Sequence, residues 1–337
     1  MLPTHYPLSR RQFISTSTST AVLGSYSHSL PGLSASPLPQ RPNIRYGLTT
    51  GSWGMVTPPG KSLPLLRILD ETAETGFDGI RLTGFPSLLK DNNLSIRQLD
   101  EELAKRSLSF STISFGGFYR DKTKQKEILD NLRQVMEVHH YFGATSATFF
   151  PSSDVMPGES EREVYKDTFH FYRTMGKLAL EEYGVRMGIH NLPGSLVSTQ
   201  VQVDRFLQNT DPQYVFCAWD TAHLLLDGCK VLDVFKNSID RTVYLDFEDA
   251  TQSPSAKDFI APNGRRFQGS SERGKFLNSS MDLGQGDVPY PEIMAILKKA
   301  NYRGWIVPDL HSVRISATES WRIAMTYIRN HLDPVYQ

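Results

Sequence analysis

Val215-Phe216-Cys217-Ala218-Trp219-Asp220 is a short apolar run that ends on a carboxylate, and the same pattern returns as Thr242-Val243-Tyr244-Leu245-Asp246-Phe247. Both runs are rich in aromatic, β-branched and other apolar side chains and are too short for a buried helix. Runs of this kind are typical of strands that are covered on both faces, as in parallel sheets. Each run therefore predicts a buried parallel strand with an acidic residue at or near its C-terminal end.

On both sides of these two runs, the chain alternates between short apolar runs and longer amphipathic stretches. The predicted strands are residues 44–49, 79–82, 109–114, 146–150, 186–191, 215–220, 242–247 and 304–309. The predicted helices include 63–75, 96–106, 124–142, 161–183, 291–300 and 316–331. Eight strands at spacings of roughly 30–40 residues, with about 60 before the last, predict a closed (β/α)8 TIM barrel of the α/β class rather than an open sheet. Residues 41–337 are accordingly expected to form one barrel domain.

The amino-acid composition excludes several classes of protein. The 337 residues include 36 basic and 36 acidic side chains, so the formal net charge is zero. A nucleic-acid binder usually carries a basic excess, and we therefore expect no nucleic-acid partner. No apolar run reaches the ~20 residues that span a bilayer. The two cysteines, Cys217 and Cys229, are too few for a disulfide scaffold.

The N-terminal segment, residues 1–40, has the pattern of an export signal. Arg10 and Arg11 precede a weakly apolar, Ser/Thr-rich stretch that reaches Leu23, and a Pro/Ser-rich linker follows. Paired arginines in this context predict a twin-arginine signal and a protein exported to the periplasm. A basic tail with no signal function is the alternative.

Residues 250–281, between the predicted strands seven and eight, are polar and rich in Gly and Ser. This segment is too long for an ordinary connection, which predicts either a lid or a disordered insertion. It carries Lys257, Arg265, Arg266, Arg273 and Lys275, which are solvated charges in one interpretation and clamp the substrate in the other.

Ligand-type side chains collect at the C-terminal ends of four consecutive predicted strands, where TIM barrels build their active sites. His190, Asp220, Asp246 and Asp309 stand at matching depth. Three converging carboxylates would repel one another unless a cation lay among them, and oxygen ligands with one nitrogen suit Mn²⁺, Mg²⁺, Co²⁺ or Zn²⁺. Taken singly, each has a structural alternative: an Asp after a strand is often a helix N-cap, above all Asp249, and a lone His is often a hydrogen-bonded structural residue.

Several motifs resemble the xylose-isomerase-like TIM-barrel superfamily over about residues 44–330. Gly76-Phe77-Asp78-Gly79-Ile80 resembles the entry to strand two, and Trp219-Asp220-Thr221-Ala222-His223 the Asp-x-x-His after strand six. Asp282-Leu283-Gly284-Gln285-Gly286-Asp287-Val288, followed by Tyr302-Arg303-Gly304-Trp305-Ile306-Val307, is the most specific match. The superfamily includes sugar isomerases and 3-epimerases, inosose dehydratases, hydroxypyruvate isomerases and type IV apurinic endonucleases.

The resemblance implies a divalent-metal site whose ligands are typically Glu, Asp, His and Glu. The matching positions hold His190, Asp220, Asp246 and Asp309, so only Asp220 keeps its residue type. In the epimerases the strand-five and strand-eight glutamates move protons, which makes His190 and Asp309 the acid/base candidates. The substitution implies that a metal site persists while the proton-transfer chemistry changes.

Four further residues are predicted to contact the substrate: His223, Arg81, Glu248 and Trp53. Arg81 stands where many members of the superfamily have a strand-two Glu that contacts substrate.

Three functions follow from these residues, all with a small carbohydrate as the partner. The first is a metal-dependent sugar isomerase or epimerase that stabilises an enediolate. The second is a lyase that dehydrates a keto-sugar or inosose after the same proton abstraction. The third is a non-catalytic carbohydrate-binding barrel with a degenerate site. The sequence leaves the substrate, the metal and the oligomeric state open.

Overall fold

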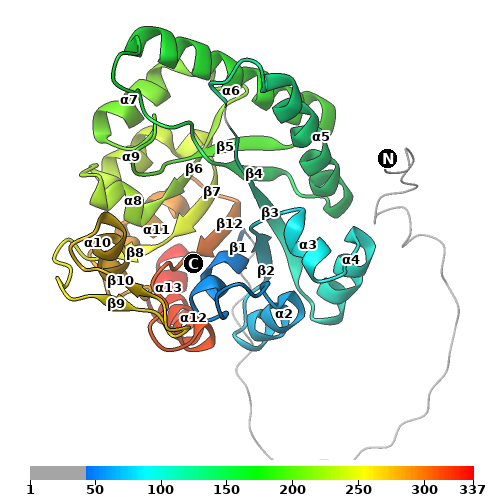
Figure 1. The fold of residues 1–337 in the computed structure, drawn as a ribbon, viewed down its shortest axis with the longest axis vertical. Coiled ribbons are helices and arrows are strands. Elements are labelled where there is room, and N and C mark those ends of the chain that lie inside the picture. The colour runs from blue at the N-terminus through cyan, green and yellow to red at the C-terminus, as the bar shows by residue number, and fades with distance from the viewer. Residues whose placement is uncertain (1–42, 118) are drawn as a thin grey trace, which may run out of the picture.

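The computed structural model describes residues 43–117 and 119–337, and eight of its strands form one closed parallel barrel. The barrel strands are β1 (Ile44–Thr49), β2 (Gly79–Leu82), β3 (Ser109–Phe115), β4 (Ser146–Phe149), β5 (Arg186–His190), β6 (Phe216–Asp220), β7 (Thr242–Phe247) and β12 (Gly304–Pro308). β1 closes the ring by pairing with β12 on one side and with β2 on the other, as Figure 1 shows. The prediction of a single (β/α)8 barrel is confirmed, and each strand begins and ends within one residue of its expected bounds. The predicted twin-arginine signal lies outside the described residues.

Helices surround the barrel and return the chain from each strand to the next (Figure 1). They are α2 (Leu65–Glu74), α3 (Ser87–Asp91), α4 (Ile96–Lys105), α5 (Gln125–Phe142), α6 (Glu161–Tyr183), α7 (Gln200–Asn209), α8 (Thr221–Leu226), α9 (Val231–Ser238), α11 (Tyr290–Lys299), α12 (Ala317–Tyr327) and α13 (Asp333–Tyr336). Short segments η2 (Thr50–Met55), η3 (Ile239–Arg241) and η4 (Ile328–Leu332) join them. Among the described residues, no helix combines the length and the apolar character that crossing a membrane requires.

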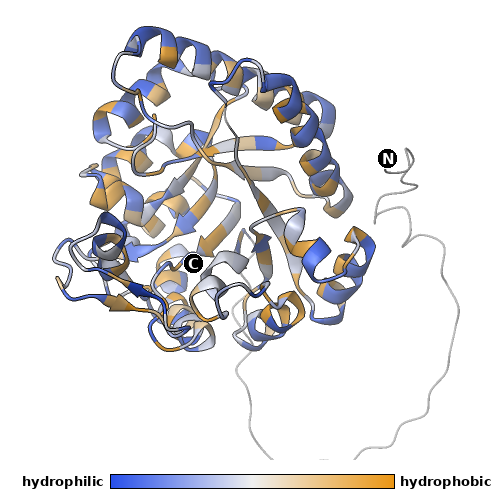
Figure 2. Ribbon diagram, viewed as in Figure 1, coloured by the Kyte–Doolittle hydropathy of each residue, from blue (hydrophilic) through white to orange (hydrophobic). Residues whose placement is uncertain are grey.

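Local sequence signals explain where the long helices begin and end. Ser95 and Gln98 form a capping box at the start of α4, which satisfies two backbone N–H groups at that helix end. Gly143 and Gly184 end α5 and α6 in the left-handed conformation, which glycine adopts without steric cost. Figure 2 shows hydrophilic residues on the outer helices and hydrophobic residues on the strands they cover. The amphipathic pattern of the sequence thus buries one face of each helix against the barrel.

The segment 250–281 is folded on the barrel rather than a featureless insertion. It contains β8 (Asp249–Ala250) paired with β11 (Ser280–Met281), β9 (Phe259–Ile260) paired with β10 (Arg266–Phe267), and α10 (Glu272–Ser279). Phe259 and Leu277 are buried, so part of this segment packs into the core rather than forming a disordered insertion. Asn263 ties the segment to the loop after β1, because its side-chain amide donates to the carbonyls of Gly54 and Thr57.

Asp249 holds the turn that leads into α11. Its hydrogen bonds explain why the motif at residues 282–288 contains two glycines. Its carboxylate accepts hydrogen bonds from the backbone N–H groups of Gly284, Gly286 and Val288, at 2.8, 2.9 and 3.3 Å. Gly284 has a φ of +88°, and a Cβ on Gly286 would lie 2.3 Å from Asp249 Oδ1. Both positions therefore require glycine, and Asp249 is a turn residue rather than a helix cap.

Candidate functional site

The barrel register brings the polar strand ends together at one mouth. β6 and β7 align Asp220 with Asp246, and β7 and β12 align Asp246 with Val307, two residues before Asp309. His190 is the last residue of β5. The side chains of His190, Asp220 and Asp246 are 5%, 0% and 0% exposed, whereas Asp309 is 13% exposed. Buried charged and polar groups at this depth require partners within the protein or from a ligand.

Arg81 from β2 enters this group and joins two of its carboxylates. Its Nη1 lies 2.5 Å from Asp246 Oδ1 and its Nη2 lies 2.5 Å from Asp309 Oδ2. Burial alone would lower the pKa of Arg81, but the two carboxylates raise it above its ordinary value. Burial would likewise raise the pKa of Asp246, yet Arg81 and His190 lower it. The structure therefore divides the four predicted ligands: Asp246 and Asp309 are ion-paired with Arg81, and His190 and Asp220 are not.

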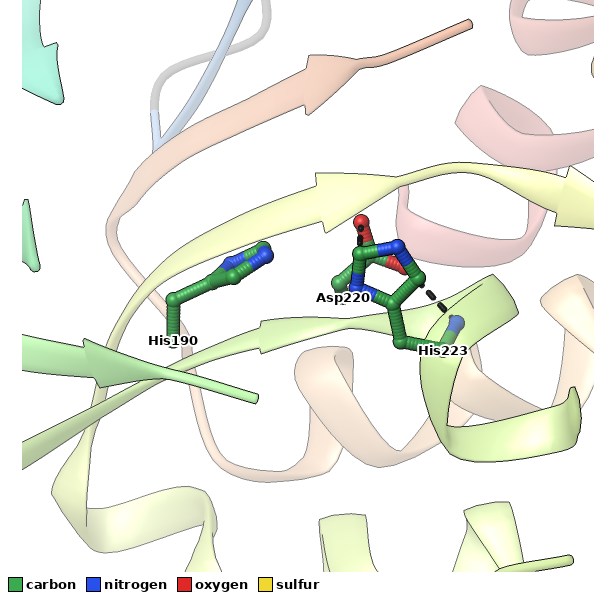
Figure 3. A group of neighbouring side chains, drawn as sticks. All are labelled: His190, Asp220 and His223. Atoms are coloured by element: carbon green, nitrogen blue, oxygen red, sulfur yellow. Dashed lines mark hydrogen bonds and ion pairs between the residues drawn. The ribbon is translucent and has the colours of Figure 1, made fainter. Parts of the chain in front are cut away.

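His190 and Asp220 form a group with His223, which lies in the first turn of α8. Figure 3 shows both imidazole rings directed toward the Asp220 carboxylate. One ligand-type atom from each residue can be chosen so that the three lie within 4.8 Å of one another. Asp220 Oδ1 caps α8 by accepting from the backbone N–H of His223 at 2.9 Å, and His223 Nδ1 lies 3.0 Å from the carbonyl of Asn191. One oxygen of Asp220 therefore caps α8, as the structural alternative predicted, and its other oxygen takes no part in the cap.

Electrostatics around Asp220 leave its charged form unfavourable in the protein alone. Burial raises the pKa of Asp220 well above its ordinary value, and the nearby Glu248 carboxylate raises it further. Burial also lowers the pKa of His223. A bound cation would reverse the penalty on Asp220, because it would stabilise the carboxylate and use the neutral imidazole as a ligand.

Glu248 and His311 form a second reactive pair beside His223. His311 Nδ1 lies 2.8 Å from Glu248 Oε1, which also accepts from the Ser280 hydroxyl at 2.9 Å. Burial would lower the pKa of His311, but Glu248 and Asp309 raise it to about 9. Burial would raise the pKa of Glu248, but His311 lowers it. The pair therefore consists of a charged Glu248 carboxylate, which can act as a base, and a charged His311 imidazolium, which can act as an acid. The side chain of His311 is 32% exposed to solvent.

Four buried polar atoms of the cluster have no hydrogen-bond partner within the described part of the chain. They are His190 Nδ1, Asp220 Oδ2, Asp246 Oδ2 and Glu248 Oε2. Three of them are carboxylate oxygens, which are the ligands that hard divalent cations prefer. Unpartnered acceptors at the catalytic face of a barrel are the chemical signature of a site that binds an external cation or a polar ligand. His190, Asp220 and His223, at the ends of β5 and β6 and in the turn that follows β6, carry donor atoms that suit a divalent ion.

Of the residues predicted to contact substrate, Trp53 lies apart from the cluster. Its indole N–H donates to Glu71 at 2.7 Å, and its ring packs 5.8 Å from that of Trp321. Sequence reasoning singled out neither His311 nor Asn191, whose amide donates to the Asp220 carbonyl. His311 could have been found from its position two residues after Asp309 at the end of a predicted strand.

Comparisons with known proteins agree with this architecture. A family model described as xylose isomerase-like TIM barrel matches residues 69–331. An inosose dehydratase of Lactiplantibacillus plantarum is 26% identical over 302 residues, covering 86% of this chain and 97% of that protein. The structure of a probable 3-DHS dehydratase, AsbF, from Bacillus anthracis superposes with a TM-score of 0.66 at 16% identity, covering 85% of this chain and 99% of that chain. A zinc-bound IOLI protein gives a TM-score of 0.64 at 17% identity, covering 85% and 97%. The family match spans well over half of the chain and covers every barrel strand except β1, and the protein accordingly belongs to the xylose isomerase-like TIM barrel family.

Proposed function

We propose that this protein is a lyase that removes water from a cyclic keto-polyol of the inosose or keto-sugar class. The observation that carries the proposal is the Glu248–His311 pair beside the His190–Asp220–His223 group. Dehydration needs a base for the proton next to a carbonyl and an acid for the departing hydroxyl, and this pair offers both. Several similar proteins are named inosose dehydratase, the first of them over nearly its whole length, which favours the same chemistry.

The pair would act through two different atoms. Glu248 Oε2 accepts no hydrogen bond from the described residues, lies 3.6 Å from His223 Nε2, and is the basic atom, which takes the proton from the carbon next to the carbonyl. As that C–H bond breaks, a C=C bond forms and the C–O bond to the β-hydroxyl breaks. His311 uses Nδ1 to bind Glu248, so its other ring nitrogen, Nε2, can give a proton to the departing hydroxyl, which leaves as water.

The proposed cofactor is one divalent cation held by His190, Asp220 and His223. When bound, such an ion polarises a carbonyl oxygen and stabilises the negative charge that develops on it. Asn191 fixes the geometry of this group, because it bonds the backbone of Asp220 on both its N–H and its carbonyl. The hydrogen bond from His223 Nδ1–H to the Asn191 carbonyl leaves Nε2 of that ring free to bind.

An isomerase or epimerase, the first function predicted from the sequence, remains the second candidate. It shares the proton abstraction but needs no acid for a departing hydroxyl. Of the acid/base candidates predicted from the sequence, Asp309 has both carboxylate oxygens engaged, one by Arg81 and one by the backbone N–H of Leu310. His190 is proposed here as a ligand. The Glu248–His311 pair therefore supports the lyase better.

The test is to incubate the purified protein with Mn²⁺, Co²⁺, Zn²⁺ or Mg²⁺ and a panel of inososes and keto-sugars in deuterated water. Loss of one water in the product mass supports the lyase. Deuterium incorporation with no loss of water would favour the isomerase, and neither reaction with any substrate or metal would favour the carbohydrate-binding barrel.

Two substitutions and one control localise the chemistry. Glu248→Gln and His311→Gln should each lower kcat by about 10²–10⁴, the usual contribution of a positioned acid or base. His170→Gln alters an exposed histidine on the outer helix α6 and should leave kcat unchanged. Full activity in Glu248→Gln would rule out the proposed base.

A further inference from the structure

Arg81 crosses the mouth of the barrel to reach carboxylates on the far side of β1. It projects from β2, whereas Asp246 lies on β7 and Asp309 follows β12. Each of its two terminal nitrogens contacts a different carboxylate at 2.5 Å, and the side chain is only 5% exposed. A bidentate arginine held this deeply has little freedom to leave, because an unpaired guanidinium would be left in a buried site.

Converging carboxylates need a cation among them, and the chain itself supplies one. The Arg81 guanidinium occupies the space between Asp246 and Asp309 that a metal bound by both would need. Zinc, for example, binds carboxylate oxygens at about 2.0–2.2 Å. Arg81 Nη1 already lies 2.5 Å from Asp246 Oδ1, and Nη2 lies 2.5 Å from Asp309 Oδ2. The guanidinium therefore excludes a metal ion from the position between these two oxygens. The free oxygen of Asp246 faces His190 Nδ1 at 3.3 Å, which suits orienting that ring.

We propose that Arg81 is a tethered cation that takes the place of a metal ion between Asp246 and Asp309, so that neither carboxylate ligates metal in this protein. Asp246 is then a positioning residue for His190, and a divalent ion is held on the β5–β6 side alone. This last point rests on the function proposed above, whereas the assignment of Arg81 does not.

If Arg81 takes the place of a metal ion, then removing its positive charge should increase the binding of divalent cations. In Arg81→Met the side chain keeps much of its bulk, and Asp246 and Asp309 are left facing each other without a counter-charge. Two buried carboxylates in that arrangement form a site for a divalent ion. In Arg81→Lys an ammonium group keeps the positive charge in place, which makes it the matched control.

Mn²⁺ binding to the full chain, stripped with EDTA, tests this by titration calorimetry. The expected result is that Arg81→Met binds one additional Mn²⁺, or binds Mn²⁺ at least tenfold more tightly than wild type, while Arg81→Lys stays within about threefold of wild type. A folded Arg81→Met protein, shown by its circular dichroism, with wild-type stoichiometry and affinity would overturn the proposal.

A second variant keeps the test independent of whether Arg81→Met folds. Asp309→Asn in the presence of Arg81 should leave Mn²⁺ affinity within about threefold of wild type, because this residue is not a ligand. A loss of tenfold or more would mean that Asp309 ligates the ion, which contradicts the assignment while supporting the metal of the proposed function. If wild type binds no Mn²⁺ and Arg81→Met does, the tethered cation stands and the proposed cofactor fails.

Discussion

The two oxygens of the Asp220 carboxylate have different surroundings. Oδ1 caps α8 through the backbone N–H of His223, while Oδ2 is buried, accepts no hydrogen bond from the described residues and lies 3.7 Å from His223 Nδ1. Burial and the neighbouring Glu248 raise the pKa of Asp220, so the folded protein binds a proton there more tightly than the unfolded chain. For an acid of this kind the charged form costs stability once the pH rises above the ordinary carboxyl pKa.

Replacing Asp220 with Asn should therefore have opposite effects with and without metal. The amide keeps an oxygen for the cap but carries no charge, so in EDTA at pH 7 the free energy of unfolding should rise by about 1 kcal/mol or more. Mn²⁺ affinity should fall at least tenfold, because a charged ligand is lost. Urea unfolding and calorimetric titration measure the two effects.

The surface variant Asp233→Asn serves as the control for this substitution, because Asp233 is exposed in the first turn of α9 and should leave Mn²⁺ affinity unchanged and change stability by only a few tenths of a kcal/mol. If Asp220→Asn lowers stability in EDTA and wild type binds no metal, Asp220 is a helix cap and nothing more.

At the scale of single residues, the sequence predicted which strand ends are polar but not how they pair. A barrel must bring the C-terminal ends of its strands to one mouth, so the meeting of His190, Asp220 and Asp246 follows from the strand pattern. The reach of Arg81 across β1 depends on the depth and rotamer of one long side chain, which no sequence period encodes. The same holds for His311, whose partner Glu248 lies on a different strand end.

At the scale of elements, the turn at residues 284–288 depends on one buried acid. Asp249 accepts three of its backbone N–H groups, which holds the chain close to β8 before it enters α11. The approach is close enough that a Cβ on Gly286 would lie 2.3 Å from Asp249 Oδ1 and 2.6 Å from the carbonyl oxygen of Ala250. This contact is the physical reason for a glycine in the motif.

We expect Gly286→Ala to lower the free energy of unfolding by about 2 kcal/mol, because the added methyl group must push the turn away from Asp249. Gly54→Ala is the matched control, since a Cβ there meets no atom within 4 Å and its φ is unstrained. Urea unfolding at one pH compares the two variants. Equal stability of Gly286→Ala and Gly54→Ala would show that the turn adjusts freely.

The elements that the sequence predicted well are those with a clear hydrophobic period. Buried parallel strands are continuous apolar runs, and long helices such as α5 and α6 carry a full amphipathic stripe with a terminal glycine. Within residues 250–281 the strands are two residues long and α10 is short, and the buried apolar side chains, such as Phe259 and Leu277, are few and irregularly spaced. Too few positions repeat there for a period to appear, so the segment was expected to be a lid or disordered.

At the scale of the whole molecule, we propose that the chain is exported as a folded barrel. The proposal rests on Arg10 and Arg11 in residues 1–40, which lie outside the described part of the chain. Replacing both with lysine should remove the protein from the periplasmic fraction, whereas lysine in place of the exposed Arg97 on α4 should not. Unchanged periplasmic recovery of the double variant, measured by cell fractionation, would contradict twin-arginine export.

The bond between Asn263 and the loop after β1 has a kinetic consequence. Its side chain binds carbonyls 209 and 206 positions earlier in the chain, at Gly54 and Thr57. Contacts between such distant residues carry a large loop-closure entropy until other pairings have already brought the segments together. Here the pairing of β1 with β12, which joins the two ends of the barrel, brings the two segments together. We therefore expect this part of the rim around the polar mouth to form late in folding, after the barrel has closed.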